Sequence, residues 1–141
     1  MNVFVDTSVW SLALRRSAPS RVPEVELLAS YLEQGDLVVS TGVVLQELLQ
    51  GFQGPKAKTA IIKNFSLLPM ITPDIEDHIE AAALRNRCRR KGVQIGTIDA
   101  LIAQLCIGHG LPLLTTDRDF QAVSRHCPLP LVKGPYTPGR A

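Results

Sequence analysis

Short apolar runs alternate along the chain with longer stretches in which apolar residues recur at helical spacing. Each short run ends at turn residues or charges, a pattern that predicts buried strands. The predicted strands cover residues 2–5, 37–40, 67–71, 113–115 and 129–132. Proline cannot donate to a sheet ladder, so Pro69 weakens the third strand and Pro130 makes the last one an edge strand.

The stretches between these strands predict helices. They cover residues 9–14, 24–34, 42–50, 55–65, 73–91 and 98–109, with a short helix or turn at 117–126. Thr41, Thr72 and Thr97 are expected to cap helix N-termini, and Gly35 and Gly110 to follow C-termini. Alternating strands and helices predict an α/β fold with a parallel sheet and helices on both faces.

Composition adds limits to this picture. The chain has 141 residues, 45% apolar and 20% charged, which suits one globular domain. Residues 1–133 are predicted to form that domain, and the proline- and glycine-rich residues 134–141 a flexible tail. No apolar run is long enough for a membrane span and no signal peptide is evident, so a cytoplasmic location is expected. Three dispersed cysteines favour neither a zinc site nor a disulfide framework.

Acidic residues fall at places where an α/β sheet binds its ligands, beyond the carboxyl ends of the strands. Asp6 follows the first strand, Asp117 follows the strand at 113–115, and Asp99 lies in the first turn of a helix. Glu47 interrupts an otherwise apolar helix. Each acid alone has an ordinary structural explanation: Asp6 and Asp117 as helix or turn caps, Asp99 as a helix-dipole partner and Glu47 as a solvent-facing residue. Four carboxylates brought together would repel one another, and oxygen ligands without Cys or His suit Mg²⁺ or Mn²⁺.

Four segments together resemble the PIN-domain nucleases. They are VFVDTS at 3–8, QEL at 46–48, GTIDALIA at 96–103 and LTTDRDF at 114–120. Their order and the chain length are especially similar to the VapC toxins of bacterial toxin–antitoxin systems, and the resemblance covers essentially the whole chain. It implies a three-layer α/β sandwich with a central parallel sheet of four to five strands.

The resemblance also assigns roles to individual residues. The implied catalytic and metal-binding quartet is Asp6, Glu47, Asp99 and Asp117, with Asp119 as an additional acid. The hydroxyls implied to support these carboxylates or the metal's water are those of Thr7, Ser8 and Thr116. The implied activity is Mg²⁺- or Mn²⁺-dependent cleavage of RNA, commonly tRNA or ribosomal RNA. The implied partners are a second copy of the chain and a small VapB-like antitoxin that inserts into the active-site groove.

Basic residues form two clusters that could contact RNA phosphates or simply be solvated helix ends. The RNA-binding candidates are Arg15, Arg16, Arg85, Arg89, Arg90 and Lys91, and Arg21 and Arg87 lie among them. A separate apolar set could line an antitoxin groove or a dimer face, or belong to the core. It consists of Trp10, Leu12, Phe52 and Phe65.

Other functions on a similar sheet fit the sequence less well. A haloacid-dehalogenase-type phosphatase needs a second aspartate where Ser8 stands. A receiver domain needs a phosphate-accepting aspartate after its third strand, but Pro73 and Asp74 are better explained as a helix start. No glycine-rich phosphate loop follows a strand. A housekeeping RNA-processing nuclease and a catalytically inactive RNA-binding or signalling domain remain alternatives.

Overall fold

A four-stranded parallel sheet forms the centre of the molecule. The computed structural model describes residues 1–15 and 22–133, with strands β1 (Asn2–Val5), β2 (Leu37–Thr41), β3 (Met70–Ile71) and β4 (Leu113–Leu114). The strand order is β3-β2-β1-β4, and every neighbouring pair is parallel. The central position of β1 and β2 explains why their sequences read as continuous apolar runs.

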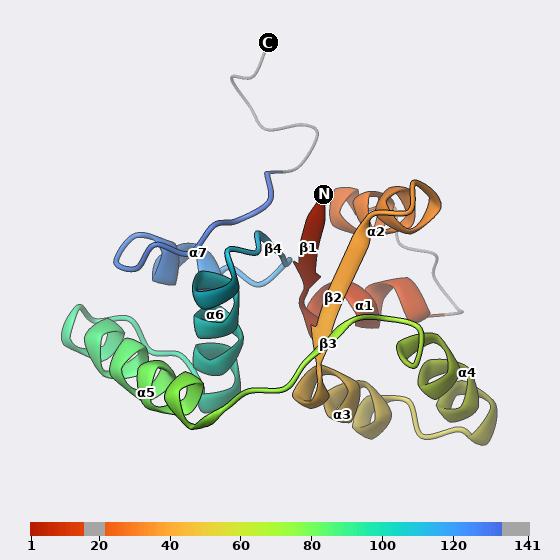
Figure 1. The fold of residues 1–141 in the computed structure, drawn as a ribbon, viewed down its shortest axis with the longest axis horizontal. Coiled ribbons are helices and arrows are strands. Elements are labelled where there is room, and N and C mark those ends of the chain that lie inside the picture. The colour runs from red at the N-terminus through yellow and green to blue at the C-terminus, as the bar shows by residue number, and fades with distance from the viewer. Residues whose placement is uncertain (16–21, 134–141) are drawn as a thin grey trace, which may run out of the picture.

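Seven helices surround this sheet in the described part of the chain. They are α1 (Thr7–Leu14), α2 (Pro23–Glu33), α3 (Gly42–Gly51), α4 (Pro55–Phe65), α5 (Ile75–Arg90), α6 (Thr97–His109) and α7 (Asp119–Ser124). Figure 1 shows α5, α6 and α7 on one side of β1 and β2, and the first four helices on the other. The predicted α/β sandwich with helices on both faces is confirmed. No helix in residues 1–15 or 22–133 is long and apolar enough to cross a membrane.

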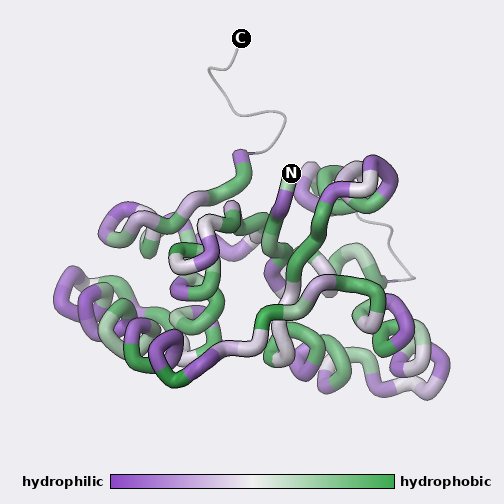
Figure 2. The backbone as a smooth tube through the Cα atoms, in the orientation of Figure 1, coloured by the Kyte–Doolittle hydropathy of each residue, from purple (hydrophilic) through white to green (hydrophobic). Residues whose placement is uncertain are grey.

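The core fills the space between the sheet and the two helix layers. Figure 2 shows hydrophobic residues concentrated along β1, β2 and α6, whereas α5 carries many hydrophilic residues. Trp10 and Phe65 are both buried, and their rings pack with centroids 5.0 Å apart. Both belong to the hydrophobic core, and Trp10 also lines a surface pocket. Leu12 and Phe52 are half-buried, and Phe52 also packs against the core.

Prolines shorten the outer strands relative to the prediction. The third strand is only Met70–Ile71, because Pro69 precedes it and cannot donate to the ladder. The predicted strand at 129–132 is reduced to a single parallel bridge between Leu113 and Leu131. Pro130 contributes only its carbonyl there, which accepts from the Leu113 N–H at 2.8 Å.

Helix caps differ from the prediction in two places. The capping residue of α5 is Asp74 rather than Thr72, because Asp74 and Asp77 each accept the other's backbone N–H, at 2.8 and 2.9 Å. Gly96, not Thr97, precedes α6, and Thr97 is its first helical residue. Gly110 ends α6 in the left-handed conformation, as predicted, with φ of 63°.

Candidate active site

Asp6 lies where β1 ends and α1 begins. Its backbone N–H donates to the Leu114 carbonyl of β4 at 2.9 Å, and its own carbonyl accepts from Val9 and Trp10 in α1. The side chain is only 5% exposed. The sheet and the helix therefore fix this carboxylate at the carboxyl edge of the two adjacent strands, where the sequence predicted a ligand site.

Two hydroxyls hold the Asp6 carboxylate from different segments. Ser8 Oγ and Thr115 Oγ1 each donate to Asp6 Oδ2 at 2.8 Å. Thr115 Oγ1 also accepts from the Asp117 N–H at 3.0 Å, and Ser8 Oγ accepts from the Thr116 N–H at 3.1 Å. This network joins the end of β1 to the segment that follows β4.

Thr115 is the site residue that the sequence analysis missed. The supporting hydroxyl was expected from Thr116, but Thr116 is exposed and joins the network through its backbone N–H instead. Successive side chains point in opposite directions along extended backbone, so only one of two adjacent threonines can face Asp6. Leu113 and Leu114 are both buried, so the apolar pattern of this strand gives no signal for which of the two threonines faces Asp6.

Glu47 reaches the site from α3. It is half-buried, and its Oε1 accepts a hydrogen bond from Thr7 Oγ1 at 2.8 Å. This contact links α3 to the first turn of α1. The bond uses Oε1 of Glu47, and the other carboxylate oxygen, Oε2, takes no part in it.

The remaining acids come from α6 and from the segment between β4 and α7. Carboxylate oxygens of Asp99, Asp117 and Asp119 lie within 4.8 Å of one another. Asp117 Oδ1 accepts a hydrogen bond from the Asp119 N–H at 2.9 Å. This bond fixes the position of the Asp119 backbone relative to the Asp117 side chain. Asp99 and Asp117 are half-buried, whereas Asp119 is exposed.

The electrostatics of Asp99 depend on burial and on the other acids near it. The pKa of Asp99 is raised to about 6, first by burial and then by the charges of four other carboxylates. Those carboxylates belong to Asp6, Asp117, Glu47 and Asp119. The tightest group is therefore Asp99, Asp117 and Asp119, and Asp6 and Glu47 lie near enough for their charges to act on Asp99.

This donor set fits a hard divalent cation. The described residues that converge on Asp99 supply only carboxylate oxygens, without His or Cys, the ligand chemistry that Mg²⁺ and Mn²⁺ prefer. Repulsion among the acids would fall when a cation binds between them. The nearby Cys106 is a core thiol, and burial and the charge of Asp6 raise its pKa.

The basic candidates are spread over several surfaces. Arg85 and Arg89 line a cavity between the end of α5 and the start of α6, and of these two only Arg89 is exposed. The exposed residues Arg15, Arg90 and Lys91 do not line this cavity. Arg87 donates to Cys127 Sγ at 3.7 Å. The other two, Arg16 and Arg21, lie outside the described residues.

Comparison with known proteins decides the family. The PIN domain model matches residues 3–126. The chain belongs to the PIN-domain family. This confirms the resemblance seen in the sequence, and it places the acidic cluster in the domain type that the four motifs indicated.

Several proteins named as VapC ribonucleases are relatives of this PIN domain. Ribonuclease VapC11 of Mycobacterium tuberculosis is 29% identical over 125 residues, which cover 87% of this chain and 92% of that protein. VapBC2 from Rickettsia felis, solved bound to a DNA fragment from its promoter, matches with a TM-score of 0.71 and 25% identity. That match covers 94% of this chain and 98% of the other.

A further solved structure shows the same fold. It is VapC20 of Mycobacterium tuberculosis, described as a toxin that cleaves the sarcin-ricin loop. Its TM-score is 0.67 at 21% identity, and the match covers 85% of this chain and 93% of that chain. The similarity to VapC proteins thus extends over most of the PIN domain in both sequence and structure.

Proposed function

We propose that this PIN-domain protein is a divalent-metal-dependent endoribonuclease that acts as the toxin of a type II toxin–antitoxin pair. The observation that carries the proposal is the convergence of four other carboxylates on Asp99 at the carboxyl edge of the parallel sheet. The matches to VapC ribonucleases support RNA as the substrate, with tRNA or ribosomal RNA as the class. The matches to VapBC complexes support a small VapB-like antitoxin as partner.

Mg²⁺ or Mn²⁺ would be held by the quartet of Asp6, Glu47, Asp99 and Asp117, with Asp119 at the exposed rim. A bound divalent cation supplies a Lewis acid, which attracts the scissile phosphate and activates water for attack. Without a cation, these acids would repel RNA by their own negative charge.

The protein's own contribution is to hold the carboxylates in position. Both hydroxyls on Asp6, from Ser8 and Thr115, donate to Oδ2, so Oδ1 is directed away from these bonds. Thr7 holds Glu47 in the same way through Oε1. Fixed hydroxyl donors orient each carboxylate before the cation or the RNA arrives, which lowers the cost of assembling the site.

The test compares wild type, Asp99→Asn and Glu76→Gln. Glu76 is an exposed acid on α5 outside the cluster, so Glu76→Gln is a matched control for loss of a carboxylate. Each protein is expressed briefly in a host cell, and new RNA 5′ ends are mapped across the transcriptome. Purified proteins are then given the cleaved RNA with Mn²⁺, with Mg²⁺ or with a chelator.

We expect discrete new ends from wild type and Glu76→Gln, none from Asp99→Asn, and no cleavage when metal is chelated. Growth arrest that is relieved by a short neighbouring gene product would identify the toxin rather than a housekeeping nuclease. Equal ends from wild type and Asp99→Asn, or growth arrest without new ends, would contradict catalysis at this site. RNA binding without cleavage would then indicate a binding-only domain.

A further inference from the structure

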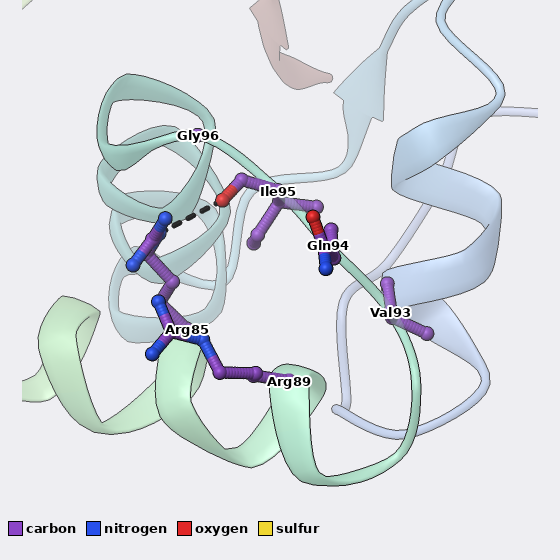
Figure 3. Close-up of a pocket in the computed structure, with 6 residues that line it drawn as sticks. All are labelled: Arg85, Arg89, Val93, Gln94, Ile95 and Gly96. Atoms are coloured by element: carbon purple, nitrogen blue, oxygen red, sulfur yellow. Dashed lines mark hydrogen bonds between the residues drawn. The ribbon is translucent and has the colours of Figure 1, made fainter.

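A basic cavity lies between the end of α5 and the segment that leads into α6. It has a volume of about 430 Å³. Its lining residues are Arg85, Arg89, Val93, Gln94, Ile95 and Gly96. Figure 3 shows the two arginines rising from α5 on one side, with the backbone of residues 93–96 on the other. None of these lining residues carries a carboxylate.

Among the residues that the structure describes, no carboxylate forms an ion pair with either guanidinium group of this cavity. Within residues 1–15 and 22–133, the ion pair present joins the N-terminal amine to Asp36, so neither Arg85 nor Arg89 has a carboxylate within 4.0 Å. Arg85 Nε donates to the Ile95 carbonyl at 2.8 Å (Figure 3). That bond fixes the half-buried side chain and uses one of its five N–H donors.

Arg89 complements Arg85 from the next turn of the same helix. Residues four apart lie on one face of a helix, so the two side chains reach the same cavity. Arg89 is exposed, and Figure 3 shows its side chain extending across the lower part of the cavity. Two cations in a concave site without anions attract a negatively charged ligand, and guanidinium groups match phosphate geometry.

The cavity adjoins the acidic cluster through α6. Gly96 lines the cavity and caps α6, and Asp99 follows in the first turn. Three helical residues advance roughly 4.5 Å along the axis, so the two sites lie close together.

We propose that this cavity is a phosphate subsite for the RNA strand, next to the phosphate that is cleaved. This inference rests on the proposed nuclease function. It assigns the contact with the RNA phosphate to Arg89, while Arg85 is held in place by its bond to the Ile95 carbonyl. An RNA strand carries phosphates at regular intervals, so one strand can reach the acidic cluster and the cavity at once. Arg90 and Lys91 follow on the chain but do not line the cavity, and they make no specific contact in this proposal.

The test measures binding of a short synthetic RNA that spans the mapped cleavage site. All proteins carry Asp99→Asn to prevent cleavage, and each RNA phosphate in turn is replaced by a neutral methylphosphonate. The variants are Arg89→Gln and the matched control Arg90→Gln, which removes the same charge from the next exposed residue of α5. Thermal unfolding of each variant checks that the fold is retained.

In the Asp99→Asn parent, a methylphosphonate in place of one phosphate next to the cleaved bond should lower the affinity for RNA about tenfold. This is the loss expected when a charge-assisted hydrogen bond is removed. Arg89→Gln should lower the affinity for the unmodified RNA by a similar factor and remove the effect of that position. It should also reduce the slope of log affinity against log salt by about 0.7, the value for one phosphate contact on a single strand. Arg90→Gln should keep the position effect.

Other outcomes would overturn the subsite. One such outcome is that Arg89→Gln and Arg90→Gln lower the affinity for RNA equally and leave the effect of the same methylphosphonate position intact. That result would mean that the arginines act only as a diffuse positive surface. Unchanged RNA binding with weakened binding of the antitoxin would mean that the cavity takes an acidic protein segment. Failure of the parent to bind RNA at all would instead contradict the proposed function itself.

Discussion

Asp99 is subject both to burial and to the charges of the other acids of the site. Burial and four neighbouring carboxylates raise its pKa to about 6. Its ionised form is therefore disfavoured in the folded protein until a cation compensates the repulsion. A residue that costs stability in the metal-free protein and is still placed at the centre of the cluster is typical of a functional site.

The first residue-scale prediction concerns pH and stability without metal. Because the pKa of Asp99 is higher in the folded than in the unfolded state, its contribution to stability is present below about pH 4 and is lost as pH rises through about 6. Asp99→Asn should therefore be more stable than wild type at about pH 8, by roughly 1–2 kcal/mol, because solvent screening of this half-buried group reduces the full effect of the shift. The difference should vanish near pH 4.

Urea unfolding in a chelator, at several pH values, measures this difference. A difference that does not depend on pH would contradict the raised pKa. Addition of Mg²⁺ or Mn²⁺ serves as the internal control, because it should stabilise the wild type more than Asp99→Asn.

The second residue-scale prediction separates two adjacent threonines. Thr115→Val removes the donor to Asp6 and the acceptor of the Asp117 N–H, and should cost about 1–3 kcal/mol of unfolding free energy. Thr116→Val keeps its backbone N–H bond to Ser8 and should change stability by less than about 0.5 kcal/mol. The binding affinity for Mn²⁺ should fall only for Thr115→Val. Equal effects of the two substitutions would show that Thr115 has no special role.

Elements position these residues through their ends. β1 delivers Asp6 at its carboxyl end, the segment after β4 delivers Asp117, and the first turn of α6 delivers Asp99. The sequence predicted these elements because their apolar spacing is regular. It misplaced the caps of α5 and α6. Asp74 caps α5 through a local pair of bonds with Asp77, and Gly96 precedes α6 without a side-chain cap.

The element-scale prediction tests the cap of α5. Asp74→Ala removes the carboxylate that accepts the Asp77 N–H, and should lower the unfolding free energy by about 1 kcal/mol. Thr72→Ala alters the residue that the sequence pattern favoured as the cap, and should be neutral within about 0.5 kcal/mol. Chemical denaturation of the two variants measures both values. A larger loss for Thr72→Ala would reverse the assignment of the cap.

The whole molecule brings the site together through its strand order. β1 lies between β2 and β4, so the first strand in the sequence pairs with the last. Asp6 and Asp117 thereby meet although more than a hundred residues separate them. α3 and α6 lie on opposite sides of the sheet (Figure 1), and each sends one acid, Glu47 or Asp99, to this edge.

The sequence by itself determined the α/β class, most helices, the two central strands and the identity of the acids. These features follow from local periodicity and from short motifs, which can be recognised in the sequence without knowledge of the tertiary structure. It could not determine that Thr115 rather than Thr116 supports Asp6, that residues 129–132 make one bridge rather than a strand, or that Arg85 and Arg89 share a cavity. Those features depend on which segments lie side by side, and only the tertiary structure decides that, because their hydrogen bonds and charges act between residues far apart in the chain.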